Sequence, residues 1–380
     1  MAVHLHAKKA GPASGDTAFS RRLALGGIFA AFAAPAQASH GGIDLEADWF
    51  AFARRFLHPS GRILDTGNGN VSHSEGQGYA LLAAVRAHDQ RSFDHILNWT
   101  VEALRRPDDS LLAWRWRPGT DVPVNDMNNA TDGDIFVAWA LAIAGDKWRV
   151  PRYRARATQM ARDILRRCVT QVGRRSVLLP GAYGFRNEQR VVLNLSYYTL
   201  PALRALSFLA PDPAWRRVET DFLPLIRHAR FGQWGLPPDW LELPASGEGQ
   251  GIPARGWPGR FSFDAVRIPL NLCWSGLHHK AAVAAARRFW LEQPHGVMPA
   301  WVDLQTGLQA PFAAPSGVRA VARLAEAAQR GYGRAEDMPR VEDAADYYAA
   351  ALTLLSRIAW HDLSLGLSST ENGDATRRAG

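Results

Sequence analysis

The sequence predicts an all-α fold built as a double ring of helices. Three observations lead to this prediction. After residue 40 the apolar residues recur mainly at helical spacing, fully apolar helices alternate with amphipathic ones, and alternating strand patterns are few. About 340 residues follow the N-terminal segment, and dividing them by six leaves about 57 per helical hairpin, which is enough for two helices and their loops.

Residues 1–38 are predicted to be a cleaved export signal. The paired arginines Arg21 and Arg22 resemble a twin-arginine signal, and they precede a short apolar stretch at 23–34 and a Pro-Ala-Gln-Ala cleavage pattern that ends at Ala38. The apolar stretch is about 12 residues long, whereas a membrane span needs about 20. A disordered N-terminal tail is the alternative. We therefore expect a periplasmic or secreted protein without a membrane span.

Two segments illustrate the two kinds of helix. Residues 135–144 are apolar all round, so this helix should be buried on every side. Residues 154–169 repeat apolar side chains at spacings of three and four, and arginines fill the opposite face. We interpret the first as an inner helix and the second as an outer helix.

The remaining helices complete a single predicted domain at 39–368. Glycine and proline separate them, and no linker divides the chain. Residues 177–179 and 191–193 are predicted to form a short ribbon, and residues 369–380 are predicted to be a disordered tail. The other helices are predicted at 44–57, 76–89, 91–105, 197–209, 215–229, 265–275, 278–291, 317–330 and 342–359.

Composition narrows the function classes. The chain has 14 tryptophans, whose flat apolar faces suit a protein core or stacking on sugar rings. The net charge of +8 is spread out. The export signal carries +3, and the remaining +5 forms no long basic run. Nucleic-acid binding is therefore not favoured.

The two cysteines, Cys168 and Cys273, lie in apolar helical segments. Export would allow a disulfide between them, but buried free thiols suit such segments equally well, and we favour free thiols. Neither cysteine has a spacing typical of a metal site.

Three acidic segments carry the candidate chemistry. Glu75 begins a helix between glycines that would allow close approach of a ligand, Asp132 and Asp134 precede the buried apolar helix, and Asp264 lies among aromatic residues three positions before Arg267. Each has a simpler interpretation as a helix cap, a carboxylate at a helix dipole or an ordinary ion pair. Together they supply the two carboxyl groups that glycoside hydrolysis needs.

The same segments resemble the signature regions of glycoside hydrolase family 8. Residues 130–141 match its A-S/T-D-A/G-D block and following helix, residues 74–79 match its general-acid segment, and residues 263–267 match its general-base segment. The likeness extends more loosely from about residue 45 to residue 355 and is strongest to endoglucanases encoded with bacterial cellulose synthases. It implies an (α/α)6 barrel and inversion at the anomeric carbon, and it implies no metal or organic cofactor.

The resemblance also implies roles for individual residues. Glu75 would be the general acid, Asp264 the general base that activates water, and Asp132 would hold the sugar and the water. For inversion the two catalytic carboxyl groups should stand about 6.5–9.5 Å apart. The pKa of Glu75 should be raised so that it is protonated at working pH.

Other residues are predicted to contact the substrate. They resemble family positions that line the cleft, except that Arg267 is expected to orient Asp264 or a sugar hydroxyl. His73 is expected to support the acid rather than to react. The predicted substrate contacts are Tyr197, Arg267, Trp114, Trp116, Trp240 and Asp134.

The predicted function is hydrolysis of cellulose or soluble β-1,4-glucans by a monomeric endoglucanase, with a functional link to cellulose synthesis. Chitosanase and xylanase specificities occur in the same family, and a polysaccharide lyase on a similar barrel is a further alternative. A non-catalytic glycan-binding subunit of an exopolysaccharide export system is the alternative from another class, although the chain retains all three carboxylates.

Overall fold

Helices form most of the part of the chain that the structure describes. The computed structural model covers residues 42–293, 296–331 and 333–375, with side chains described as far as Leu363. The helices are α2 Leu45–Phe56, α3 Ser74–Arg86, α4 Gln90–Ala103, α5 Thr131–Lys147, α6 Pro151–Cys168, α7 Leu200–Leu209, α8 Pro213–His228, α9 Arg267–Trp274, α10 Ala281–Leu291, α11 Ser316–Arg330 and α12 Tyr347–Ala375.

The two kinds of helix behave as their sequences predict. Helix α5 is buried almost throughout, because nearly every position carries an apolar side chain. Helix α6 buries one stripe that includes Tyr153, Ala157 and Met160, while arginines such as Arg152 and Arg156 remain exposed. Burial of one stripe is what places α6 outside α5, against which it packs.

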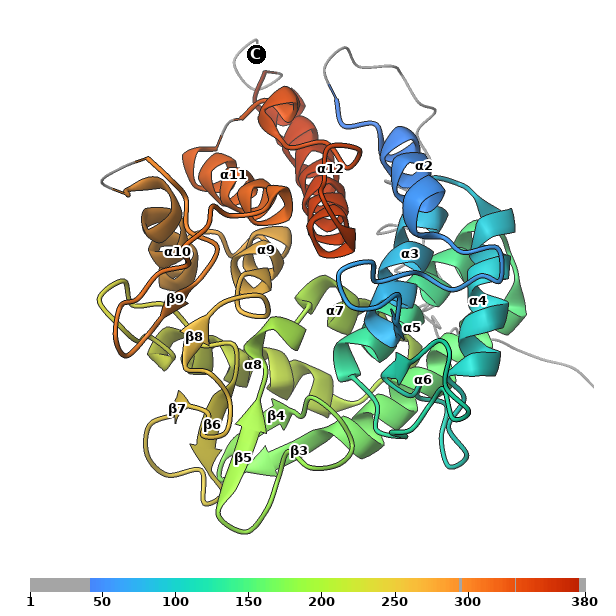
Figure 1. Ribbon diagram of the computed structural model, residues 1–380, viewed down its shortest axis with the longest axis horizontal. Helices are drawn as coiled ribbons and strands as arrows, with labels where there is room; N and C mark the ends of the chain where they lie inside the picture. The colour runs from blue at the N-terminus through green and yellow to red at the C-terminus, as the bar shows by residue number, and fades with distance from the viewer. Residues whose placement is uncertain (1–41, 294–295, 332, 376–380) are drawn as a thin grey trace, which may run out of the picture. The chain divides into compact units, whose positions relative to one another are not determined.

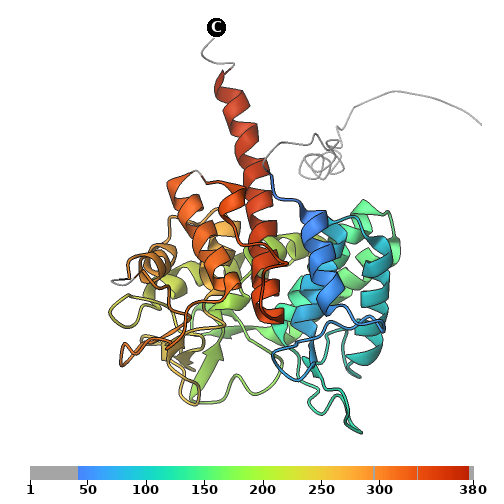
Figure 2. The same ribbon diagram turned by 45° about the horizontal axis from the view of Figure 1, so that its top comes forward.

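The buried helices close on themselves. Helices α3, α5, α7, α9 and α12 contact one another in turn, and α12 also contacts α3 and α2, so that the last helix meets the first ones (Figure 1). The amphipathic helices α4, α6, α8 and α10 pack against this ring. Figure 2 shows most of the connecting loops and short strands gathered at one end of the helices.

Short antiparallel strands stiffen these loops. They are β1 Ser72–His73 with β2 Arg115–Trp116, β3 Val169–Val172 with β4 Arg175–Leu178, β5 Arg190–Leu193 with β6 Leu241–Pro244 and β7 Ile252–Pro253, and β8 Arg260–Phe261 with β9 Val302–Asp303.

The predicted ribbon between 177–179 and 191–193 is wrong in its pairing. The first segment pairs with β3 through a two-residue turn in which Gly173 has a φ of +59°, and the second pairs with β6. A strand pattern shows that a segment can pair, but its partner is set by the turn and by the packing around it.

Two glycines bring the starts of α3 and α5 together. A Cβ atom at Gly78 would lie 2.7 Å from Cβ of Phe136, and one at Gly133 would lie 2.7 Å from the backbone nitrogen of Glu75. Any larger residue would force the helices apart. The expectation that the glycines beside Glu75 admit a ligand is wrong for Gly78, because a neighbouring helix occupies the space. This close packing carries Glu75 to the first turn of α5.

Several sequence predictions concern the ends of the chain. The predicted signal at residues 1–38 lies outside the described residues. Helix α12 continues to Ala375, within the region 369–380 for which the sequence predicts disorder, and residues 376–380 lie outside the described part. Within the described ranges, no helix combines the length and hydropathy needed to cross a bilayer. Cys168 and Cys273 are both buried free thiols, as favoured.

Candidate active site

One guanidinium gathers the three predicted carboxylates. Nη1 of Arg267 donates to Glu75 Oε2 and, over 3.0 Å, to Asp132 Oδ2, while Nη2 donates to Asp264 Oδ1 over 2.5 Å. Glu75 stands in the first turn of α3, Asp132 in the first turn of α5, and Arg267 is the first residue of α9. Residues separated by as many as 192 positions therefore meet at one point.

The four side chains differ in their access to solvent. Those of Glu75 and Asp264 are 28% and 29% exposed, whereas those of Asp132 and Arg267 are 2% and 9% exposed. A substrate can therefore reach Glu75 and Asp264, while Asp132 and Arg267 hold them from behind. The cation among these carboxylates is the guanidinium, and no group of three or more His, Cys, Asp or Glu in the described ranges is arranged to hold a metal ion.

Glu75 and Asp132 titrate as a pair. Burial and the negative charge of Glu75 raise the pKa of Asp132 well above its ordinary value. Burial alone would also raise the pKa of Glu75, but the charge of Arg267, a hydrogen bond with Asp132 and the charge of His73 outweigh it and lower that pKa. The expectation of a raised pKa at Glu75 is therefore wrong for the site without substrate. Within the pair, the pKa of Asp132 lies above that of Glu75, so Asp132 is the stronger holder of a shared proton.

The pKa of Asp264 is shifted upward, which is the direction that a general base requires. Burial raises its pKa above the ordinary value, and the charge of Glu75 adds to this, although the charge of Arg267 opposes it. The charges of the surrounding groups in turn raise the pKa of Arg267 against its own burial. The guanidinium therefore stays charged and favours the ionised form of Asp264.

Aromatic side chains form one wall of the site. The ring of Tyr197 lies 5.7 Å from the guanidinium carbon of Arg267, and its edge faces Trp240 at 6.4 Å. Trp240 also makes stacked contacts with Trp257, at 5.3 Å, and with Phe185, at 5.8 Å. Trp240 is half-buried. Flat aromatic faces of this kind suit the apolar faces of sugar rings.

The predicted tryptophans Trp114 and Trp116 lie next to the start of α3, the helix that carries Glu75. Strand β2 pairs with β1, which leads directly into α3, so that Trp116 lies opposite Ser72. Trp114 stacks on His73 with ring centroids 6.1 Å apart and donates from its indole nitrogen to Asp126. This stacking fixes the ring of His73, whose charge lowers the pKa of Glu75; its supporting role stays a prediction.

Asp134 does not join the site. Its side chain is fully buried, and its carboxylate accepts hydrogen bonds from the Leu112 backbone over 2.9 Å and from the Asn129 amide over 2.8 Å. Two residues along a helix turn a side chain by about 200°, so Asp134 points away from Asp132. The prediction that Asp134 contacts the sugar is wrong, and its carboxylate instead ties the 112 and 129 segments to α5.

Sequence reasoning missed three residues near the cluster. The hydroxyl of Tyr79 lies 2.9 Å from Nη1 of Arg267, Tyr348 donates to the backbone carbonyl of Phe263 over 3.0 Å, and Asp239 accepts from the turn that carries Asp264. Tyr79 ends the segment that contains Glu75, so its spacing of four residues along one helix face was an available signal. Tyr348 and Asp239 gave no such signal, because their partners lie far along the chain.

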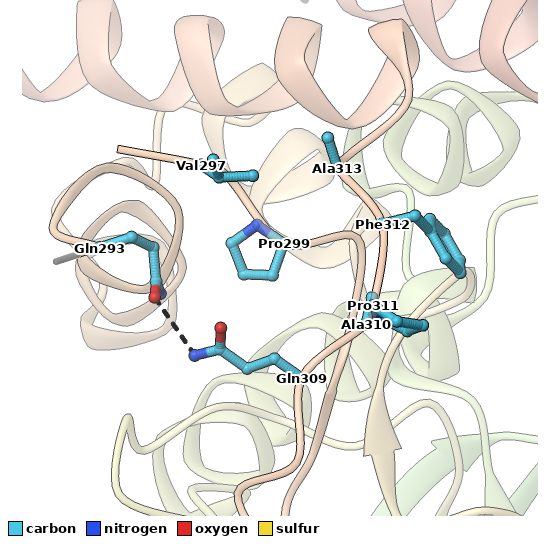
Figure 3. Close-up of a pocket in the computed structure, with 8 residues that line it drawn as sticks. All are labelled: Gln293, Val297, Pro299, Gln309, Ala310, Pro311, Phe312 and Ala313. Carbon is cyan, nitrogen blue, oxygen red and sulfur yellow. Dashed lines mark hydrogen bonds between the residues drawn. The ribbon is translucent and has the colours of Figure 1, made fainter. Parts of the chain in front are cut away.

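A separate hollow lies outside this site. Gln293, Pro299, Gln309, Phe312 and their neighbours line a pocket of about 250 Å³ (Figure 3). Its two glutamines are hydrogen-bonded to each other over 3.2 Å, and its lining contains no acidic or basic side chain. It therefore lacks the groups that acid–base chemistry requires.

Comparison with known proteins decides the family. The sequence profile described as "Glycosyl hydrolases family 8" matches residues 18–361. The chain belongs to glycoside hydrolase family 8. This family member is 44% identical, over 82% of its length and 89% of the relative, to a "Probable endoglucanase" of Novacetimonas hansenii. It is also 39% identical to an "Endoglucanase" of Cellulomonas uda, over 73% and 76% of the two chains.

Solved structures agree with the predicted architecture. The family 8 chain superposes on the endo-β-1,4-glucanase CMCax of Acetobacter xylinum with a TM-score of 0.78 and 43% identity, covering 84% of this chain and 98% of that one. The endoglucanase Cel10 of Klebsiella pneumoniae gives a TM-score of 0.77 at 38% identity, with 83% and 99% covered. The predicted all-α (α/α)6 barrel is confirmed.

Proposed function

We propose that this glycoside hydrolase cuts β-1,4-glucan chains internally and inverts the anomeric carbon. Glu75 acts as the general acid, Asp264 as the general base, and Asp132 with Arg267 holds both in place. The observation that carries the proposal is the sharing of one guanidinium by three carboxylates, of which only Glu75 and Asp264 are open to solvent.

The proposed reaction is a single displacement. Glu75 gives its proton to the glycosidic oxygen as the bond from that oxygen to C1 breaks. A water molecule attacks C1 from the opposite face, and its proton passes to Asp264. The new reducing end is therefore the α-anomer.

The proton for Glu75 comes from its pairing with Asp132. Asp132 is almost fully buried and hydrogen-bonded to Glu75, and it retains its proton at a pH where an ordinary carboxyl group has lost it. Transfer of that proton within the pair protonates Glu75 for catalysis. The separation of 6.5–9.5 Å expected between the acid and the base stays a prediction.

The substrate assignment rests on the relatives. Both curated relatives compared above carry the name endoglucanase, and the two superposed structures are described as an endo-β-1,4-glucanase and an endoglucanase. The aromatic wall around Trp240 supplies stacking faces for neutral sugar rings. Both observations favour β-1,4-glucan over the charged polymers that lyases and chitosanases bind.

The product anomer tests the proposal directly. Proton NMR of cellohexaose cleavage is expected to show the α-anomer at new reducing ends within the first minutes. Asp264→Asn is expected to lower kcat/KM by about 10²–10⁴-fold, because water then lacks its base. Asp303→Asn, in the hairpin next to the Asp264 turn, is the matched control and should remain active.

Other outcomes of this assay contradict the proposal. Early β-anomer would mean retention and would remove the role of Asp264 as base. Cleavage of xylo- or chito-oligosaccharides but not of cellohexaose would indicate another specificity. A product absorbing in the ultraviolet would indicate a lyase, and no cleavage of any of these would favour a binding protein.

Trp240→Ala is expected to raise KM for cellohexaose about 10-fold with kcat changed less than about 2-fold. Loss of one aromatic face removes about 1–1.5 kcal/mol of stacking, and 1.4 kcal/mol corresponds to a factor of ten. Trp360→Ala is the control. Trp360, on helix α12, is also half-buried, but it packs against Gly333. An unchanged KM for Trp240→Ala would exclude the wall as a binding surface.

The biological setting is proposed from the sequence. The signal pattern at 1–38 supports export, and the resemblance supports an enzyme that trims stray glucan during cellulose synthesis. N-terminal sequencing of exported protein should begin after Ala38. Unchanged cellulose in a strain lacking the gene would argue against the link to synthesis.

A further inference from the structure

The turn that carries Asp264 needs hydrogen-bond acceptors from elsewhere. Residues 262–265 lie just before α9 and outside its ladder of hydrogen bonds, so the N–H groups of Ser262 and Ala265 need acceptors from another segment. Val266, the residue before Arg267, contributes no side-chain cap. The acceptor comes from Asp239, whose Oδ1 accepts from the Ser262 backbone over 2.9 Å and from the Ala265 backbone over 2.8 Å.

Asp239 is itself held firmly. Its backbone N–H donates to the Arg260 carbonyl over 2.7 Å, so that the segment is tied to β8 at the base of the same turn. Two buried prolines, Pro237 and Pro238, precede it and restrict the backbone. The carboxyl group of Asp239 therefore anchors the turn that carries Asp264 to this restricted segment.

Asp239 can accept these two hydrogen bonds whether or not its carboxyl group is ionised. Burial and the nearby charge of Asp264 raise its pKa to about 7, although the backbone hydrogen bonds of the turn act in the opposite sense. Below pH 7 the group is mostly neutral, and the carbonyl-like Oδ1 still accepts both hydrogen bonds. An asparagine side chain offers the same oxygen in the same place.

We propose that Asp239 is a positioning residue for the general base: through two backbone hydrogen bonds it holds the 262–265 turn so that Asp264 faces the attacking water. This inference rests on the proposed role of Asp264. Because Asp239 also precedes Trp240, an effect through the aromatic wall is the competing explanation, and it would change substrate binding rather than turnover.

The test compares Asp239→Ala, Asp239→Asn and Asp264→Ala on cellohexaose. Asp239→Ala should lower kcat by about 10²-fold with KM changed less than about 2-fold, because a small displacement of the base is enough for such a loss. Asp239→Asn should remain within about 3-fold of the wild type, since it restores the acceptor. Asp239→Ser, too short to reach the turn, replaces the alanine variant if that variant does not fold.

A matched control separates positioning from general damage. Asp163 on α6 also accepts from a backbone N–H, that of Ser110 over 2.8 Å, and is buried away from the cluster. Asp163→Ala should lower the melting temperature about as much as Asp239→Ala while leaving kcat within about 2-fold. Equal losses of kcat in both variants would overturn the inference.

Rescue of the reaction rate by azide provides a further test. A residue with only a structural role would not show such rescue. Azide is already an anion, so it needs no base: its nitrogen bonds to C1, the C1–oxygen bond breaks, and Glu75 protonates the leaving oxygen. Azide should therefore raise the rate of both Asp264→Ala and Asp239→Ala, with an α-glycosyl azide as product, and should not raise that of the wild type.

The possible outcomes separate the positioning role of Asp239 from the assignment of Asp264 as the base. Rescue of Asp264→Ala but not of an impaired Asp239→Ala, a raised KM in place of a lowered kcat, or an asparagine variant as impaired as alanine would each overturn the positioning role alone. Wild-type activity in Asp264→Ala would overturn the assignment of the base and the positioning role with it.

Discussion

Glu75→Gln is expected to lower kcat/KM on cellohexaose by about 10³-fold, within the range for loss of a general acid. The amide cannot give a proton to the glycosidic oxygen, but its carbonyl can still accept from Arg267, so the arrangement of the cluster should persist. Melting temperature and circular dichroism should stay close to those of the wild type. Steady-state kinetics of the purified variant provide the measurement.

A substrate with a better leaving group gives a more specific test of this prediction. An aryl cellobioside with a dinitrophenolate leaving group needs no protonation, so Glu75→Gln should lose less than about 10-fold on that substrate. Asp264→Asn should lose activity on both substrates, because water attack needs the base in either case. Glu102→Gln, an exposed carboxylate on α4, should match the wild type on both. An equal loss of Glu75→Gln on the two substrates would show that Glu75 is not the acid.

Arg267→Met is expected to abolish activity and to destabilise the fold by about 3–5 kcal/mol at pH 7, as removal of one partner from a buried ion pair does. The variant leaves Glu75, Asp132 and Asp264 close together without the cation that all three contact. Urea denaturation at several pH values provides the measurement.

The loss of stability in Arg267→Met is expected to depend on pH in a definite direction. Without the guanidinium, mutual repulsion and burial raise the pKa values of the three carboxyl groups above those of the unfolded chain. The folded variant then binds more protons than the unfolded one, so its stability should increase as pH falls, and the deficit should shrink from pH 7 to about pH 4.5. A deficit independent of pH would mean that Arg267 acts by packing alone.

Arg255→Met is the matched control for this experiment. Arg255 also binds a buried carboxylate, Glu242, but its side chain is 68% exposed and Arg190 binds the same carboxylate. Its removal should leave both the stability and the activity close to those of the wild type.

The pattern of side chains along the chain was enough to predict the helices and most of their limits. Periodicity separates α5 from α6, because a helix buried on all sides needs an apolar residue at every position, whereas an outer helix needs only a stripe. Local motifs likewise placed Glu75 and Asp132 at helix starts and Asp264 beside Arg267, since these relations span a few residues. The choice of free thiols at Cys168 and Cys273 followed from their apolar surroundings.

Only the tertiary structure decided what these residues do to one another. The sequence contains nothing that pairs Arg267 with Glu75 or Asp239 with the Asp264 turn, because hydrogen bonds between distant segments depend on how the ring closes. Gly78 and Gly133 bring two carboxyl groups together by allowing two helices to touch, and the resulting interaction raises the pKa of Asp132, whereas the pKa of Glu75 is lowered. Side-chain type and spacing are local properties, whereas pKa and partner choice depend on distance and burial, which the packed fold alone sets.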